Sequence, residues 1–202
     1  SESLPAVYVQ RPIVWCVYTD HTTVPEIYSF DARTMEFTLF ATPPGVVDVP
    51  PVHSQQVTYT SADGTEVRMF IISPTRTAEK PRPTVLYGYG GFGIPLSPGY
   101  SASVLAWVAA GGVWAVANLR GGGEEGEQWH RDGMLANKQN VFDDFHAAAQ
   151  YLVDEGWTTT QQLAINGGSN GGLLVGAAMT QRPDLYQAVV CVAPLLDMVR
   201  YT

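Results

Sequence analysis

Residues 163–179 read LAINGGSNGGLLVGAAM, and this stretch decides the fold. An apolar run typical of a buried strand leads into a glycine-rich centre, and an apolar run typical of a helix follows. The centre fits Gly-x-Ser-x-Gly, the pattern of a nucleophile elbow, in which a serine occupies the sharp turn between a strand and a helix. The stretch therefore predicts a strand at Leu163–Ile165, a helix at Gly171–Gln181 and a nucleophilic hydroxyl at Ser169.

The residue types of this pattern have a steric and an electrostatic reason. Gly167 and Gly171 can pack closely because they carry no Cβ. The first N–H groups of the following helix lack intrahelical acceptors, so the N–H of Asn170 is a natural donor to an oxyanion beside Ser169. The alternative is a glycine-rich turn with an incidental serine, but the strand and the helix on either side favour the elbow.

Strands and helices continue to alternate on both sides of this stretch. Such alternation predicts an α/β fold, a mostly parallel sheet with helices on both faces. Asp63-Gly64 is a hairpin signal between two further strands. The expected strands are Gln56–Thr60, Val67–Ile72, Thr84–Tyr87, Val113–Ala117 and Ala188–Val192, and the other expected helices are Ser101–Ala110 and Asn140–Glu155, with Asn140 as N-cap.

The N-terminal part of the chain has a different pattern. Residues 1–44 contain short strand-like runs separated by turn residues, with no helical periodicity. Residues 42–51 contain four prolines and read as an interdomain linker. We therefore expect one domain at residues 1–44 and a second at 45–202. The expected strands of the first are Ala6–Gln10, Ile13–Tyr18, Glu26–Phe30 and Phe37–Phe40, with a hairpin at residues 29–39.

Two further glycine-rich loops follow predicted strands. Residues 87–93 read YGYGGFG, and in α/β-hydrolases the loop after an early strand completes the oxyanion hole, where a phenol can replace a backbone N–H. A flexible loop whose tyrosines pack on neighbours is the alternative. Residues 121–126 read GGGEEG and favour a flexible connection. We expect Arg120 to pair with a carboxylate such as Glu124 or Asp143, and His130 to have a local structural role.

Composition narrows the class of protein. The chain is 46% hydrophobic and 15% charged, a globular balance, and its net charge of -8 argues against a nucleic-acid partner. No apolar run reaches the ~18 residues that span a bilayer. Cys16 and Cys191 form neither a disulfide framework nor a metal cluster. Because cysteines are scarce and no signal peptide is visible, we expect a cytoplasmic location. The chain begins with Ser, so we expect it to be processed or cut from something longer; a periplasmic or secreted location is the alternative if an N-terminal signal is missing.

Four segments together resemble the prolyl oligopeptidase family. They are residues 86–92 (LYGYGGF), 115–124 (AVANLRGGGE), 137–145 (NKQNVFDDF) and 165–175 (INGGSNGGLLV), the last running into 181–185 (QRPDL). The resemblance implies a seven-bladed β-propeller joined to an α/β-hydrolase domain. Residues 1–44 would then be the last propeller strands, and residues 45–202 the N-terminal half of the hydrolase domain.

The resemblance also implies a function. Ser169 would attack the carbonyl carbon after a proline, with the Asn170 N–H and the Tyr89 hydroxyl as the oxyanion hole and Phe92 lining the proline pocket. The substrates would be short proline-containing peptides, the whole protein would be a monomer, and no metal or organic cofactor is implied. The relatives that cut after Lys or Arg need acidic groups to bind the buried cation, and no acidic cluster is evident near the motifs of this chain. The resemblance therefore favours the branch that cuts after proline.

The sequence lacks the base that a serine nucleophile needs. The fold places the triad in the order Ser, acid, His, but His21, His53, His130 and His146 all precede Ser169. Asp184 and Asp197 follow the serine without a histidine to orient. We therefore expect this stretch to be inactive alone, with the acid and base in further residues. The alternatives are another serine hydrolase, such as an esterase or an acylaminoacyl peptidase, and a non-catalytic hydrolase-like binding module.

Overall fold

The computed structural model describes residues 12–45 and 49–200, which form two compact units. The first unit consists of residues 1–50 with 97–105, and the second of residues 51–96 with 106–202. The strand expected at Ala6–Gln10 lies outside the described residues. The domain boundary expected at residue 44 stays a prediction.

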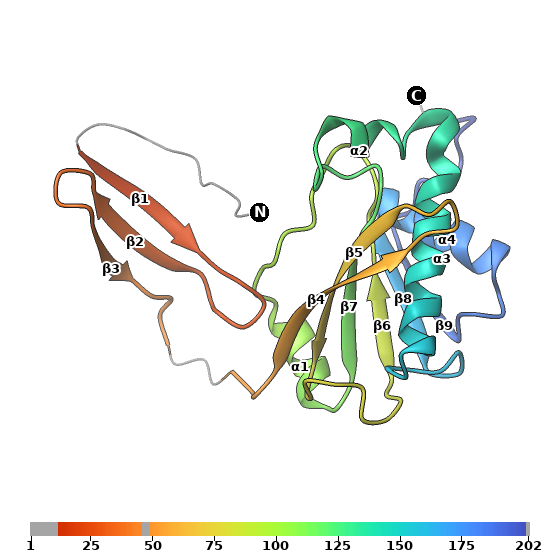
Figure 1. The fold of residues 1–202 in the computed structure, drawn as a ribbon, viewed down its shortest axis with the longest axis horizontal. Helices are drawn as coiled ribbons and strands as arrows, with labels where there is room; N and C mark the ends of the chain where they lie inside the picture. Colours follow the sequence, from red (N-terminus) through yellow and green to blue (C-terminus); the bar gives the residue numbers. More distant parts are fainter. Residues whose placement is uncertain (1–11, 46–48, 201–202) are drawn as a thin grey trace. The chain divides into compact units, whose positions relative to one another are not determined.

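The first unit contains a three-stranded antiparallel sheet (Figure 1). Its strands are β1 (Ile13–Tyr18), β2 (Glu26–Asp31) and β3 (Glu36–Ala41), in the order β1-β2-β3. The predicted hairpin between β2 and β3 is present, and the N–H of Met35 donates to the carbonyl of Asp31 across its turn at 2.8 Å. Large apolar side chains on this sheet are exposed, among them Trp15 and Phe37.

The second unit contains a six-stranded sheet in the order β4-β5-β7-β6-β8-β9. The pairings from β7 to β9 are parallel, whereas β4 pairs with β5 and β5 with β7 in antiparallel fashion. The sheet is therefore mixed: three of its five pairings are parallel, as predicted for most of it, and two are antiparallel. The turn at Gly64, with φ 88°, folds β5 back on β4. The strands are β4 (His53–Thr60), β5 (Glu66–Ser73), β6 (Thr84–Tyr87), β7 (Val113–Asn118), β8 (Leu163–Gly168) and β9 (Ala188–Val192).

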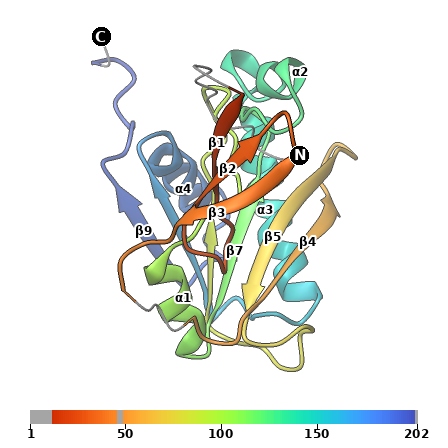
Figure 2. The same cartoon turned by 90° about the vertical axis from the view of Figure 1, so that its left-hand side faces the viewer.

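Helices lie on both sides of this sheet. Helices α3 (Lys138–Asp154) and α4 (Asn170–Gln181) pack against one face, and the part of α1 (Ala102–Ala109) that belongs to this unit lies on the other (Figures 1 and 2). A short helix, α2 (Glu127–Arg131), and a 3₁₀ turn (Leu135–Asn137) precede α3, and the sequence analysis predicted neither. The N-cap of α3 is Asn137 and not Asn140, whose side-chain amide donates to the carbonyl of Asp132 at 2.9 Å.

The core lies between the sheet and the pair α3 and α4. One face of each central strand is fully buried, as alternation along a strand requires, and it meets the apolar stripes of the two helices. The central residues of this core are Met69, Ile71, Leu86, Ala115, Ile165, Phe145, Leu152 and Leu174. This packing fixes the carboxyl ends of β6, β7 and β8 at one edge of the sheet, where the three glycine-rich loops begin.

A buried ion pair connects this core to the hairpin formed by β4 and β5. Arg120, 4% exposed, donates to the carboxylate of Asp144, which is fully buried, and also to Asp63. The expected partners Glu124 and Asp143 were wrong: Asp143 is one residue earlier on α3, and a step of about 100° around the helix turns its side chain to another face. Despite burial, the hydrogen bonds that Arg120 donates to Asp144 and Asp63 raise its pKa.

Candidate active site

Ser169 occupies the bend between β8 and α4 that the sequence predicts. Its backbone has φ 55° and ψ −116°, a conformation that costs a non-glycine residue about 1–3 kcal/mol. Hydrogen bonds hold this conformation: the N–H of Ser169 donates to Val192 at 2.9 Å, and its carbonyl accepts from Gly172 at 3.0 Å. The side chain is exposed, and its hydroxyl has no hydrogen-bond partner among the described residues.

Glycines make the bend possible by close approach. A Cβ on Gly167 would collide with the carbonyl of Gly171, and a Cβ on Gly171 would lie 2.7 Å from the carbonyl oxygen of Gly88. A Cβ on Gly172 would lie 2.7 Å from the Cα of Pro194. The elbow is therefore pressed against the loop that follows β6, as well as against the segment after β9.

The loop after β6 brings Tyr89 to the elbow. A Cβ on Gly171 would lie 3.6 Å from Cδ2 of the Tyr89 ring, so the ring lies beside the start of α4. Tyr89 is half-buried, and its hydroxyl has no hydrogen-bond partner within the described part of the chain. The side-chain amide of Asn170 donates to the carbonyl of Tyr89 at 2.6 Å. The structure thus brings together Ser169, Asn170 and Tyr89, while their roles stay predictions.

Phe92, the other predicted site residue, lies in the same loop. It has φ 57° and its side chain is 63% exposed. The preceding Gly91 is buried against the side chain of Asn170, where a Cβ would collide with the amide nitrogen. The ring of Phe92 is therefore presented to solvent from a backbone that is fixed at the elbow, and its place in a proline pocket stays a prediction.

Lys138, which sequence reasoning did not single out, also contacts this loop. Its Nζ donates to the carbonyl of Gly90 at 2.7 Å and to Oδ1 of Asn170 at 3.2 Å. Burial lowers the pKa of Lys138 to about 8. The residue lies in the segment 137–145 that carried the family resemblance, but a lysine at a helix start has no local pattern that distinguishes it from a surface charge.

The loop after β7 is packed rather than flexible, which corrects the expectation for residues 121–126. The N–H of Gly93 donates to the carbonyl of Gly121 at 3.0 Å, and Cβ atoms on Gly121 or Gly123 would collide with the backbone of Gly90 or Gly93. His130 Nδ1 lies 2.9 Å from the same carbonyl of Gly121. The glycines here serve close contact between two loops, and His130 has the local structural role that was expected.

No acid–histidine pair accompanies Ser169 among residues 12–45 and 49–200. His146 bonds the Tyr186 hydroxyl at 2.8 Å and Gln181 at 3.2 Å, and burial lowers its pKa. Gln181 ends α4 whereas Ser169 precedes it, so about 18 Å of helix separates them. The carboxylates of Asp184 and Asp197 are bound by Arg182 and Arg200 at 2.7 and 3.1 Å.

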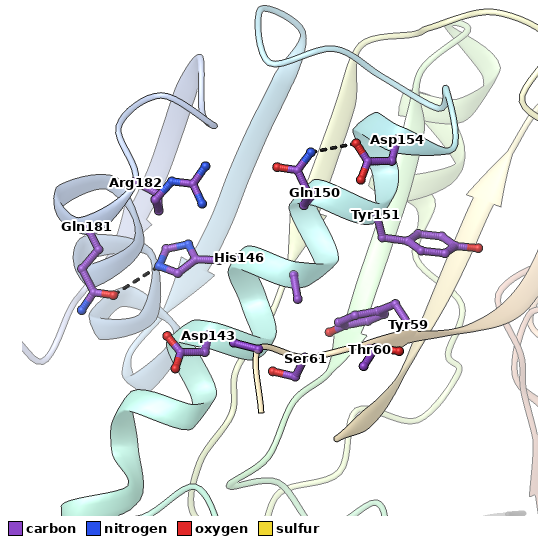
Figure 3. Close-up of a pocket in the computed structure, with 12 residues that line it drawn as sticks. Tyr59, Thr60, Ser61, Asp143, His146, Gln150, Tyr151, Asp154, Gln181 and Arg182 are labelled. Atoms are coloured by element: carbon purple, nitrogen blue, oxygen red, sulfur yellow. Dashed lines mark hydrogen bonds between the residues drawn. The ribbon is translucent and has the colours of Figure 1, made fainter. Parts of the chain in front are cut away.

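A cavity of about 600 Å³ lies between the end of β4, the outer face of α3 and the end of α4 (Figure 3). Tyr59, His146, Gln150 and Arg182 are among the residues that line it. Ser169, Tyr89 and Phe92 are not, so this cavity is separate from the elbow.

Three general features of the described residues concern metal ligands, membrane-spanning helices and thiols. No group of three or more His, Cys, Asp or Glu side chains in the described residues is arranged to hold a metal ion. No helix in the same residues is long and apolar enough to cross a membrane. Cys16 and Cys191 are free thiols.

Comparison with known proteins places the chain among peptidases. The model of the prolyl oligopeptidase family matches residues 98–202. An uncharacterized peptidase of Sinorhizobium fredii is 46% identical over 87% of this chain and 24% of its own length. A prolyl endopeptidase of Elizabethkingia meningoseptica is 43% identical over 91% of this chain and 26% of its own length.

A solved structure from a study of two prolyl endopeptidases shares the fold. It superposes with a TM-score of 0.88 at 51% identity, over 95% of this chain and 28% of the solved one. The chain thus spans about a quarter of the length of the curated relatives it matches.

Proposed function

The chain belongs to the prolyl oligopeptidase family, and from that membership we propose that it is the nucleophile-bearing part of a serine peptidase that cleaves short peptides after proline. The observation that carries the proposal is the exposed hydroxyl of Ser169 on a strained bend, beside the first amide of α4 and the ring of Tyr89. A hydrolase of acyl groups needs this combination of nucleophile and oxyanion donors.

In this mechanism the Ser169 oxygen attacks the carbonyl carbon of the scissile peptide bond. Its proton passes to a histidine that lies in further residues of the protein. The carbonyl electron pair moves onto oxygen, and this oxyanion accepts hydrogen bonds from the Asn170 N–H and the Tyr89 O–H. The tetrahedral intermediate then expels the amine, which takes a proton from the histidine, and water hydrolyses the remaining ester on Ser169.

The remaining parts of the proposal concern architecture and specificity. Strands β1–β3 would be the last strands of a β-propeller, and residues 45–202 the N-terminal half of an α/β-hydrolase domain. Phe92 would contact the proline side chain of the substrate, since its exposed ring belongs to the same loop as Tyr89. We propose a monomer in the cytoplasm, acting on peptides without a cofactor.

One observation favours a second candidate, a hydrolase-like module that binds partners without catalysis. No histidine of the described chain contacts Ser169. Sequencing the gene beyond codon 202 separates the two: a continued reading frame with a downstream Asp and His supports the peptidase, and a stop codon at that point supports the module.

The peptidase itself is tested with the full-length protein and fluorogenic peptides. We expect a peptide with proline at the cleaved position to be hydrolysed at least tenfold faster than matched peptides with Ala, Lys or Arg there. Ser169→Ala should reduce kcat by about 10³-fold or more. Equal rates on all peptides would contradict post-proline specificity and favour an esterase or an acylaminoacyl peptidase. Full activity of Ser169→Ala would contradict the serine mechanism.

A further inference from the structure

Lys138 occupies a position that two physical effects disfavour for a cation. It is the first residue of α3, where the positive end of the helix dipole repels an ammonium group. Its side chain is also partly buried, and burial lowers its pKa to about 8. In the described ranges, 12–45 and 49–200, no carboxylate lies within 4.0 Å of its Nζ.

The contacts that offset these costs lie at the loop after β6, at the first residue of α4 and at an aromatic ring of α3 itself. Lys138 Nζ donates to the carbonyl of Gly90 at 2.7 Å and to Oδ1 of Asn170 at 3.2 Å. The amide of that same Asn170 side chain donates to the carbonyl of Tyr89 at 2.6 Å. The ammonium also lies 6.0 Å from the centre of the Phe142 ring, a favourable cation–π distance.

These three hydrogen bonds link Lys138 to the two residues that carry the proposed oxyanion donors. One member, Asn170, supplies a backbone N–H at the elbow, and the other, Tyr89, supplies the phenol. The ammonium group of Lys138 holds both the Gly90–Gly91 peptide, through the carbonyl of Gly90, and the side chain of Asn170. A neutral side chain could make these contacts as well. Hydrogen bonding alone therefore does not explain why a charged residue occupies this position.

We propose that Lys138 is a positioning residue for the oxyanion hole, which fixes the Gly90–Gly91 peptide and the side chain of Asn170 and adds an unpaired positive charge beside the developing oxyanion. This inference rests on the proposed peptidase function. Because negative charge appears on the substrate oxygen only as the transition state forms, the charge should act on kcat rather than on substrate binding.

The test uses the full-length protein with a proline-containing fluorogenic peptide. Lys138→Met keeps the apolar stem and removes the ammonium, and we expect kcat to fall about ten- to a hundredfold while KM changes less than about threefold. Lys80→Met is the matched control because Lys80 is exposed, and it should have no effect on either constant.

Chemical rescue separates charge from folding. In Lys138→Cys, the thiolate displaces bromide from 2-bromoethylamine, and the new C–S bond yields a side chain of the same length ending in an ammonium. We expect most of the lost kcat to return. Treated wild-type protein controls for alkylation of Cys16 and Cys191.

Hydrogen exchange of the peptide covering residues 88–93 gives a readout that needs no catalysis. We expect Lys138→Met to speed its exchange, with no change in β1–β3. An unchanged kcat, a rise in KM alone, or unchanged exchange with no rescue would overturn the role of Lys138. If Ser169→Ala is inactive in the same assay, the proposed peptidase function stands whatever Lys138 does; if Ser169→Ala is active, the function fails first.

Discussion

The side-chain amide of Asn170 donates a hydrogen bond of 2.6 Å to the carbonyl oxygen of Tyr89. Asn170 follows the proposed nucleophile, while Tyr89 lies 81 residues earlier in the loop after β6. The side chain of one proposed oxyanion donor thus fixes the backbone of the other. The contact therefore ties the loop after β6 to the first residue of α4.

Asn170→Ala tests this coupling, because alanine keeps the backbone N–H and loses only the side-chain hydrogen bonds. A hydrogen bond contributes about 1 kcal/mol, so we expect kcat for a proline-containing peptide to fall about five- to tenfold. Steady-state kinetics of the full-length protein measure the change. An unaltered kcat would show that the backbone alone sets the loop's position.

Tyr89→Phe removes the proposed phenolic donor while keeping the ring against Gly171. Loss of one oxyanion donor lowers kcat by about 10²–10³, with little change in KM. Tyr87→Phe is the matched control, since Tyr87 stacks on Trp114 with 6.5 Å between ring centres and its hydroxyl makes no hydrogen bond within the described residues. Equal effects of the two substitutions would remove Tyr89 from the oxyanion hole.

Two adjacent glycines of the elbow should differ sharply in tolerance. A Cβ on Gly167 collides with the carbonyl of Gly171, whereas a Cβ on Gly168 finds only ordinary contacts, the nearest at 3.6 Å from the Val192 oxygen. We expect Gly167→Ala to destabilise the protein by about 1–3 kcal/mol or more, and Gly168→Ala to be close to neutral. Urea denaturation of the full-length variants compares them, and similar losses would contradict the elbow's packing.

The two carboxylates that pair with Arg120 should contribute unequally to stability. Asp144 is fully buried, so Asp144→Asn leaves a buried guanidinium without its main counter-charge, at a cost of about 3–5 kcal/mol. Asp63 is 47% exposed, and Asp63→Asn should cost less than about 1 kcal/mol. The midpoints of urea denaturation test the difference, and the reverse order would contradict the network as described.

The stability contribution of Lys138 should depend on pH. Burial lowers its pKa from 10.5 to about 8, so between these values the unfolded chain binds more protons than the folded one. Stability of the wild type relative to Lys138→Met therefore rises with pH across this window and is constant below it. Differences in melting temperature at about pH 7 and about pH 9.5 measure this effect. A constant difference would show that the amine is not desolvated.

Much of the fold follows from local sequence patterns. The strands Ile13–Tyr18, Thr84–Tyr87 and Ala188–Val192 have the predicted bounds, because turn residues interrupt the apolar runs on both sides. The bend at Ser169 was also predicted, since Gly-x-Ser-x-Gly between a strand and a helix is the pattern of a nucleophile elbow.

The predictions of helices were wrong or incomplete where contacts between residues outside the helix determine its position. Asn140 has a residue type suited to an N-cap, but its amide bonds the carbonyl of Asp132 and the helix begins earlier, at Lys138. The short α2 helix has no apolar period to detect, and the indole N–H of Trp129 ties it to the carbonyl of Leu119, ten residues earlier, at 3.0 Å.

The site was only partly predictable for the same reason. Ser169, Asn170 and Tyr89 belong to recognisable glycine motifs, whereas Lys138 acts through contacts with residues 48 and 32 positions away. The partners of Arg120 were missed because the helical phase that separates Asp143 from Asp144 depends on where α3 packs.

The contact of the two glycine loops limits how this region can evolve. The backbone of Gly121 contacts the backbone of Gly90, and the backbone of Gly123 contacts that of Gly93. A substitution that adds even a methyl group at Gly121 or Gly123 would therefore displace both segments. Side-chain variation in this region is therefore tolerated best at the outward-facing positions Phe92 and Ile94, which are 63% and 46% exposed. If Phe92 contacts substrate as proposed, a library aimed at new specificities would start at these two positions.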